Sequence, residues 1–380
     1  MSKRLPIQFN DEQLELGSSR LADLYHKLTV ELFEQMVDRL LERGTTSLTD
    51  NPYIWQLEKL NQMHALNEHN LKVISKYTDI TEEQLRNVIE GEGLKIYTDT
   101  KSQLLEDLNK DPHFDTSHVQ KQLEAYLEQA SGDIDNLINT TLPNVVNEVY
   151  RNIAKETVAK VATGVATPDK AIAETVMKWQ EVGFRGFKDR GGKNWRIDNY
   201  ARTVVKTTTR RVYRQMRTQP ADELGIDTFY YSKKATAREA CAPLQHHIVT
   251  YGEAREEGGY SVLSLADHGY GTPAGCLGIN CGHYLTPFVI GINDMPDLGD
   301  DVKNITPEDA IKNANAQAKQ RALERSIRDS KEKLHIANKL GDNDLIDKYK
   351  SKIRTQQGAM RDFLKDKPFL NRDYAREKYY

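Results

Sequence analysis

Hydrophobic residues recur at intervals of three and four through the first 165 residues, which is the spacing of amphipathic helices. The clearest stripe follows a capping serine, Ser18 or Ser19. It consists of Leu21, Leu24, Tyr25, Leu28, Leu32 and Met36. No group of residues in this region has the spacing of a catalytic motif. We therefore predict that residues 1–165 form a helical N-terminal array whose role is scaffold and contact surface.

Two further helix starts can be read inside this array. Asn51 followed by Pro52 combines a capping side chain with the proline that the first helical position favours. Thr81 with Gln84 has the spacing of a capping box, which predicts a new helix from this point.

Residues 166–235 are predicted to be a helical connector. Apolar spacing predicts a helix over 195–218. Its other face carries the basic residues Arg210, Arg214 and Arg217. The preceding residues 183–193 mix glycines with arginines and lysines in a predicted turn. Such a loop could bind phosphate, but it lacks the Walker spacing, and we interpret it as a solvated connection. Residues 228–232 are predicted to be the first strand.

The helical period stops near residue 236, and a glycine-rich sequence takes its place. Apolar and sulfur-containing residues between the glycines indicate a packed loop rather than a flexible linker. The loop residues that matter most are Gly269, Tyr270, Gly271, Gly278 and Asn280. A short apolar run at 284–290 then predicts a strand. Residues 236–300 are therefore predicted to be a compact, self-contained α+β core domain that contains Cys and His.

All three cysteines of the chain lie in this domain. Cys281 and His283 are two residues apart, so on an extended segment both side chains point to one face. With Cys241 they have the composition of a zinc site whose fourth ligand is Cys276 or a histidine. The histidine candidates are His246, His247 and His268. Two other interpretations stay open here, namely buried cysteines without a metal and surface histidines.

Residues 301–380 have the pattern of a C-terminal helical hairpin and tail. Thr306 and Pro307 begin one helix, and a turn at Gly341 and Asp342 leads into a second, antiparallel helix. The first of these helices carries the basic residues Arg321, Arg325 and Arg328. The fold class predicted for the whole chain is thus mainly α with a small α+β domain.

Composition narrows the classes of protein to consider. The chain has 380 residues, 38% of them hydrophobic, and a mean hydropathy of −0.68, and it contains no apolar run long enough for a membrane span. Three cysteines suit a reducing cytoplasm without a disulfide framework. The net charge is −3, yet residues 195–217 and 306–380 each carry a net charge of about +6. Such basic regions could contact nucleic acid through its phosphates, independently of base sequence.

The glycine-rich segment resembles a known family in an ordered series of small and special residues. The matched positions are Ala237, Arg238, Gln245, Gly269, Tyr270, Gly271, Thr272, Gly275, Gly278, Asn280, Cys281, His283, Pro287 and Phe288. A second matched series in the C-terminal helix is Gln320, Arg321, Leu323, Glu324, Arg325, Ile327 and Arg328. Both resemble the phage minor capsid protein 2 family, relatives of the Mu F-type head morphogenesis proteins. The specific likeness covers residues from about 195 to 380.

The sequence also departs from the family pattern. Cys241 stands where the family has histidine, an exchange that keeps a zinc ligand but loses a general base. Glu239, Leu244, His246 and Gly282 replace the family's proline, tryptophan, glycine and arginine. Any function that the tryptophan or arginine carries in the family is therefore not expected here.

The resemblance implies a structural protein of a tailed-phage virion, assembled in the host cytoplasm and placed inside the head near the portal vertex. It implies the portal protein, other capsid proteins and packaged double-stranded DNA as partners, and no membrane. It further implies a role in head morphogenesis and in DNA packaging or ejection. A structural zinc ion is the cofactor that the cysteines and the resemblance together favour.

An enzyme is the main alternative, in the form of a zinc hydrolase, a nuclease-like protein or a thiol-dependent hydrolase. Cys281 would be the nucleophile and His283 the base, but residues two apart on a strand rarely meet in the required hydrogen bond. A zinc hydrolase needs a carboxylate base, for which Asp267 is the only nearby candidate. We therefore expect no enzymatic activity. A free-standing DNA-binding protein is disfavoured by the net acidity.

Overall fold

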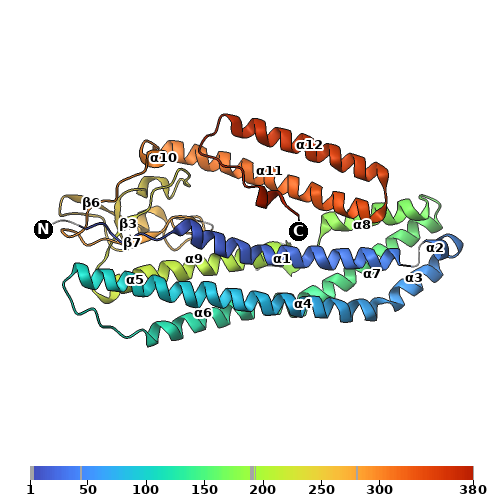
Figure 1. Ribbon diagram of the computed structural model, residues 1–380, viewed down its shortest axis with the longest axis horizontal. Helices are drawn as coiled ribbons and strands as arrows, with labels where there is room; N and C mark the ends of the chain where they lie inside the picture. The colour runs from blue at the N-terminus through green and yellow to red at the C-terminus, as the bar shows by residue number, and fades with distance from the viewer. Residues whose placement is uncertain (1–3, 43–44, 189–191, 193, 280, 380) are drawn as a thin grey trace. The chain divides into compact units, whose positions relative to one another are not determined.

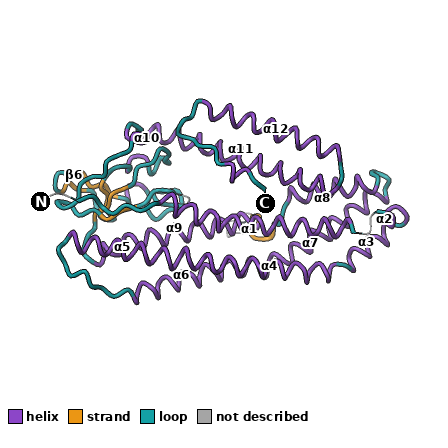
Figure 2. Tube along the Cα trace, viewed as in Figure 1, coloured by secondary structure: helices purple, strands orange, loops and turns teal. Residues whose placement is uncertain are grey.

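The computed structural model describes residues 4–42, 45–188, 192, 194–279 and 281–379 (Figure 1). Most of these residues are helical, and the strands gather in small areas (Figure 2). The predicted class, mainly α with a small mixed α+β domain, is confirmed. None of the described helices has an apolar stretch of the length needed to cross a membrane.

The long helices, in chain order, are α1 (Asp11–Leu41), α3 (Pro52–Asn61), α4 (Met63–Arg86), α5 (Glu92–Asp107), α6 (Ser117–Asp135), α7 (Leu142–Ala162), α8 (Pro168–Val182), α9 (Ile197–Glu223), α11 (Pro307–Leu340) and α12 (Asn343–Lys365). Short helical segments are α2 (Thr46–Asp50), α10 (Asp300–Lys303), the π-helical η1 (Asn87–Gly91) and η2 (Asn136–Thr141), and the 3-10 turns η3 (Ala242–Leu244), η4 (Ala266–His268) and η5 (Tyr374–Glu377).

Only some of the predicted helix starts are used. Asn51 caps α3, because its side chain accepts a hydrogen bond from the backbone N–H of Ile54 at 3.2 Å. Ser18 and Thr81 do not begin helices. Ser18 is buried inside α1, and Thr81 is buried inside α4, where its hydroxyl bonds the Tyr77 carbonyl at 2.8 Å. That bond satisfies the hydroxyl inside a helix, so the capping-box spacing carries no start signal here.

The chain divides into two compact units, each built from three separate segments. The first unit contains Met1–Ser19, Gln84–Ala130 and Val205–Gln320. The second contains Arg20–Glu83, Ser131–Val204 and Arg321–Tyr380. These units differ from the four consecutive domains predicted from sequence. The segment around the cysteines is therefore not self-contained, since residues from the first third of the chain complete its unit.

The first unit holds a five-stranded mixed sheet in the order β5-β6-β4-β3-β7. Its strands are β3 (Thr228–Tyr231), β4 (Ile248–Thr250), β5 (Arg255–Glu257), β6 (Tyr260–Ser264) and β7 (Leu285–Pro287). The central strand β3 is antiparallel to both neighbours, and Tyr231 pairs with Leu285 of β7. All four β3 side chains are buried, as its apolar and aromatic sequence leads one to expect.

The first residues described pair with a segment of this unit that lies almost three hundred residues later in the sequence. Arg4 forms a parallel bridge with Asn293, and the Arg4 carbonyl accepts a hydrogen bond from the N–H of Asp294 at 3.0 Å. The Arg4 guanidinium also lies 2.8 Å from a carboxylate oxygen of Glu106.

The second unit is helical apart from one small hairpin. Strands β1 (Arg185–Lys188) and β2 (Asn194–Arg196) pair antiparallel, so the prediction of a connection without secondary structure over 183–193 is wrong for the described residues. The part of α11 from Arg321 onward and α12 form the predicted hairpin in this unit, with a turn at Gly341 and a bond between Gln356 and Ser326 at 2.5 Å.

A charged cluster is buried inside the second unit. His26 of α1 lies 2.9 Å from a carboxylate oxygen of Asp198, and the Arg196 guanidinium approaches the other oxygen at 3.2 Å. Glu332 of α11 lies 3.7 Å from the second ring nitrogen of His26. Buried charges persist only when they are paired in this way.

Candidate metal centre

The sheet brings two distant parts of the sequence to one edge. Cys241 lies after the C-terminal end of β3, directly before η3, and Cys281 and His283 lie just before the N-terminal end of β7. Because β3 and β7 are antiparallel neighbours, these two strand ends adjoin. Cys241 and Cys281 are therefore close in space although they are forty positions apart in the sequence.

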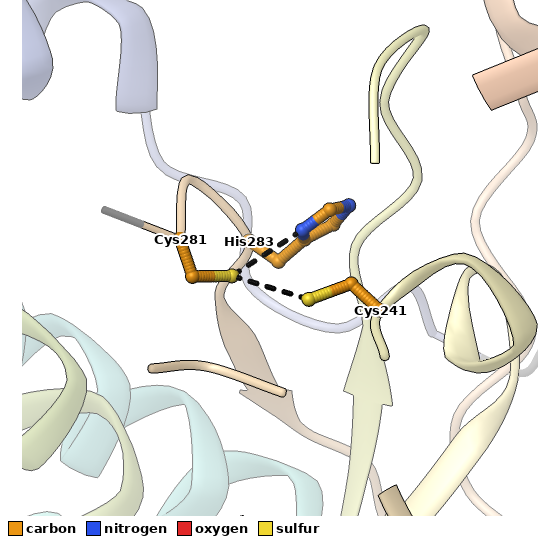
Figure 3. Close-up of side chains that lie close together, drawn as sticks. All are labelled: Cys241, Cys281 and His283. Atoms are coloured by element: carbon orange, nitrogen blue, oxygen red, sulfur yellow. Dashed lines mark hydrogen bonds between the residues drawn. The ribbon is translucent and has the colours of Figure 1, made fainter. Parts of the chain in front are cut away.

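The side chains of Cys241, Cys281 and His283 converge (Figure 3). The two sulfur atoms are 3.6 Å apart, and the Cys281 sulfur is 3.5 Å from Nδ1 of His283. All three potential ligand atoms lie within 4.8 Å of one another. The residues are buried, with exposed fractions of 0% for Cys241, 4% for Cys281 and 7% for His283. Residues two apart on a strand rarely meet in this way, but Cys281 and His283 precede β7 and come within hydrogen-bonding distance.

Gln245 determines which ring nitrogen of His283 faces the cysteines. Its side-chain oxygen accepts the backbone N–H of Lys234 at 2.6 Å, which identifies that atom as the amide oxygen. The same oxygen lies 3.2 Å from Nε2 of His283. An acceptor at that position holds a hydrogen on Nε2, so Nδ1 is the ring nitrogen available to a metal ion beside Cys281. This is the tautomer that a metal ligand needs.

The two adjoining thiols differ strongly in acidity. The hydrogen bond from Cys241, followed by contact with His283, lowers the pKa of the Cys281 thiol well below its usual range. The hydrogen bond with Cys281, together with burial, raises the pKa of the Cys241 thiol. Cys281 is thus the sulfur that ionises more readily, and a cation placed between the two would favour the thiolate form of both.

The donor set fits a zinc ion in its chemistry. Two thiols and one imidazole nitrogen are common zinc ligands, and burial is typical of sites that hold the ion for structural reasons. A buried hydroxyl also lies beside them. Tyr231 at the end of β3 is 0% exposed, and its oxygen has no hydrogen-bond partner by distance and angle among the described residues.

The other candidate ligands lie apart from this cluster. The Cys276 thiol is buried and approaches the Leu265 carbonyl at 3.5 Å, and burial raises its pKa to about 11. His246 bonds the Tyr230 hydroxyl at 3.2 Å, and His247 lies 2.9 Å from the Gln245 carbonyl oxygen. His268 is half-buried in η4. Among the described residues, the ligand cluster therefore contains Cys241, Cys281 and His283 without Cys276.

Glycines allow the loop before Cys281 to fold tightly. A Cβ atom on Gly275 would lie 1.8 Å from the Gly269 carbonyl oxygen, and one on Gly278 would lie 2.5 Å from the Pro273 carbonyl oxygen. Both backbones approach too closely for any larger residue. Gly271 adopts a φ of 87°, and Tyr270 is partly exposed with its ring 5.1 Å from that of Tyr251. Asn280 lies outside the described residues.

A cavity of about 40 Å³ adjoins the cluster within the same unit. Its lining includes Cys281 and His283 together with the basic residues Arg210, Arg214, Arg217 and Lys234. Arg217 is only 1% exposed, with its guanidinium 4.6 Å from the ring centres of both Phe9 and Tyr284. Because it is enclosed by these rings, Arg217 does not belong to a solvent-facing basic surface.

The basic residues of the C-terminal helix are placed differently. Arg325 is exposed and Arg328 is half-buried. Arg321 makes two hydrogen bonds to the buried carboxylate of Glu324, at 3.0 and 2.8 Å. Of these three residues, Arg325 is thus the most accessible to a partner.

Two residues of the site had no assigned role from sequence. In the sequence, Gln245 is only a position that matches the family, and Tyr231 is only part of a predicted strand. The signal for Tyr231 is weak, because a tyrosine in a Thr-Phe-Tyr-Tyr strand is ordinary. The signal for Gln245 is its position two residues before His247 among several polar residues, which does not reveal its partner.

Comparison with known proteins finds relatives of this chain among phage structural proteins. The profile of phage minor capsid protein 2 matches residues 9–365. A structural protein of Lactococcus phage LL-H is 31% identical over 369 residues, which cover 94% of this chain and 98% of the relative. A structural protein of Lactococcus phage mv4 is 39% identical over 115 residues, which cover 30% of this chain and 89% of the relative. No solved structure matches the chain.

The match extends over both compact units and includes the segment that brings Cys241, Cys281 and His283 together. Nearly the whole of a phage structural protein aligns with it at 31% identity. The chain therefore belongs to the phage minor capsid protein 2 family.

Proposed function

We propose that this protein is a structural component of the phage head, located inside the capsid near the portal vertex, where it assists head morphogenesis and DNA packaging or ejection. Family membership supports a virion role. Its long helices supply extended surfaces, and amphipathic helices of this kind commonly dock on partner proteins. The partners in this proposal are the portal protein and other capsid proteins.

Zinc is the proposed cofactor, and its role is structural. The observation that carries this proposal is the convergence of Cys241, Cys281 and His283 within 4.8 Å in a buried position. When bound, the ion would cross-link the loop after β3 to the loop before β7. Gln245 would keep His283 in the ligand tautomer. Cys276 is excluded from the proposed ligand set because its thiol lies against the Leu265 carbonyl.

The proposed role is not catalytic. Cys281 and His283 form a close pair. However, Cys281 is only 4% exposed, so a substrate has little access to its sulfur, and that sulfur already contacts the thiol of Cys241. Asp267, the carboxylate considered as a base, is exposed in η4 and does not belong to the ligand cluster. A hydrolytic zinc site would need a carboxylate near the ion, and the cluster of described residues contains none.

Packaged double-stranded DNA is a further proposed partner, bound weakly through phosphates. Arg325 and Arg328 offer accessible charge in one unit, and the half-buried Arg210 and Arg214 offer charge in the other. Such contacts position a protein without reading sequence.

Protease protection and cross-linking of purified virions test the proposed location. In filled heads the protein should resist added protease, and it should cross-link to portal subunits. A protein of the outer capsid surface or of the tail serves as the control. It should be digested by the added protease and should not cross-link to portal subunits from inside the head. Digestion of the protein in intact virions, or cross-links confined to tail proteins, would contradict the location.

A further inference from the structure

The hydroxyl group of Tyr231 needs an explanation that packing does not give. The residue is fully buried at the end of β3, and its oxygen has no hydrogen-bond partner by distance and angle among the described residues. A buried polar group without a partner destabilises the fold. Phe229, two residues earlier on the same face of β3, is equally buried and has no hydroxyl. A phenyl ring would therefore be sufficient for the core.

The hydroxyl lies among sulfur atoms. The Tyr231 ring packs against the imidazole of His283, with ring centres 5.2 Å apart and planes tilted by 36°. The hydroxyl interacts with the Cys241 side chain, and Cys281 and Cys276 also lie near it. The neutral hydroxyl is thus a donor beside a sulfur that becomes an anion when it binds a metal.

We propose that Tyr231 is a positioning residue of the metal centre, whose hydroxyl donates a hydrogen bond to the metal-bound thiolate of Cys241. This inference rests on the proposed zinc site and adds a second supporting group to Gln245. The two act on opposite ligands, since Gln245 orients His283 while Tyr231 stabilises negative charge on Cys241. Hydrogen bonds to charged acceptors are roughly twice as strong as neutral ones.

The test replaces Tyr231→Phe in the full-length protein and measures binding of cobalt(II), a spectroscopic substitute for zinc. Loss of a supporting hydrogen bond should weaken metal binding by about 10- to 100-fold. The thiolate-to-cobalt charge-transfer band should also shift, since the Cys241 sulfur becomes a stronger electron donor when it loses this hydrogen bond. The metal-free variant should melt at the same temperature as the wild type or higher, because an unpaired hydroxyl is removed.

Tyr150→Phe is the matched control. Tyr150 in α7 of the second unit is also 0% exposed, and its hydroxyl likewise has no hydrogen-bond partner among the described residues. Its replacement should leave cobalt affinity and the charge-transfer band unchanged. A general effect of removing a buried hydroxyl would appear in both variants, whereas the proposed contact affects Tyr231→Phe alone.

Three outcomes would overturn the inference. Cobalt affinity and a charge-transfer band in Tyr231→Phe equal to those of the wild type would refute the proposed hydrogen bond. The proposed zinc site would be unaffected by that result. Tyrosinate absorbance near 295 nm on metal addition to the wild type, absent from the variant, would show that Tyr231 coordinates the metal as an anion instead of donating. A wild-type protein that binds neither zinc nor cobalt would overturn this inference and the proposed zinc site together.

Discussion

The side-chain oxygen of Gln245 lies 3.2 Å from Nε2 of His283, on the side of the ring opposite the cysteines. We predict that Gln245→Leu weakens zinc binding by about tenfold or more, because the imidazole loses the acceptor that selects its tautomer. Competition with a calibrated chelator measures the change. Gln129→Leu is the control, since this exposed glutamine accepts a bond from Arg211 in the same unit. Unaltered affinity in Gln245→Leu would show that the amide has no role in binding.

We predict that Cys241 and Cys281 bind the metal and that Cys276 does not. Purified wild type should contain about one zinc per chain by elemental analysis. Cys281→Ser should lose the metal and melt at a lower temperature, because metal binding and folding are coupled. Cys276→Ser should retain the metal, since that thiol contacts the Leu265 carbonyl instead. Metal-free wild type, or metal loss in Cys276→Ser alone, would contradict the proposed ligand set.

In the buried charged cluster around His26, we predict that substitutions of Asp198 and Glu332 have opposite effects on the free energy of unfolding. Burial alone would raise the pKa of Asp198, but its hydrogen bond to His26 and the charge of Arg196 outweigh this and lower it. Asp198→Asn should therefore cost about 3–5 kcal/mol at neutral pH, because it leaves the Arg196 cation without its carboxylate. Burial raises the pKa of Glu332, so Glu332→Gln should stabilise the protein at neutral pH.

Their pH dependences should also differ. A carboxyl with a lowered pKa stabilises the fold above its unfolded pKa, near 4, and this contribution disappears as the pH falls through the folded value. The deficit of Asp198→Asn should shrink only in strong acid. The gain of Glu332→Gln should vanish earlier, as the pH falls through the raised pKa of Glu332 and the wild-type side chain becomes neutral. Denaturant unfolding across this pH range measures both, and equal signs at neutral pH would refute the assignment.

The tight loop before Cys281 should tolerate no side chain at Gly275. Gly275→Ala places a Cβ atom 1.8 Å from the Gly269 carbonyl oxygen, and the overlap should cost about 3 kcal/mol or more. Gly132→Ala is the control, because Gly132 lies in α6 with no atom within 4 Å of the added carbon. That change should stabilise the protein by about 0.5–1 kcal/mol. Thermal unfolding of both variants checks the contrast.

DNA binding should be weak, independent of sequence and sensitive to salt. Arg325→Ala should reduce the slope of log affinity against log salt concentration by about one for each lost phosphate contact. Arg86→Ala is a suitable control, since the Arg86 guanidinium is paired with Glu90 at 2.9 Å. Fluorescence anisotropy with duplexes of unrelated sequence measures both. Binding that depends on sequence and survives raised salt would contradict this prediction, as would no binding in dilute buffer.

Much of the helical fold could be predicted because its signals are local. Asn51 with Pro52 begins α3, and Thr306 with Pro307 begins α11, where the Thr306 hydroxyl accepts the Asp309 N–H at 3.1 Å. Thr81 carries the same kind of signal without effect, because its hydroxyl bonds a carbonyl one turn earlier. A local pattern cannot tell these situations apart when the helix already continues from before.

The metal cluster could be predicted only in part, because sequence gives the types of ligand but not their meeting point. Cys241, Cys281 and His283 follow from chemistry and resemblance. The placement of Cys276 apart from them depends on how the glycine loop turns back on β6, which no spacing rule describes. The supporting residues Gln245 and Tyr231 depend on the β3–β7 pairing, a long-range property of the sheet.

The bridge between Arg4 and Asn293 has a consequence for synthesis on the ribosome. Glu106, which pairs with the Arg4 side chain, is made early, but the backbone partners of Arg4 emerge almost three hundred residues after it. At bacterial translation rates of about 5–20 residues per second, the Arg4 backbone waits roughly 15–60 s for those partners. Slowing or truncating translation before residue 293 should therefore expose this polypeptide to chaperones and proteases.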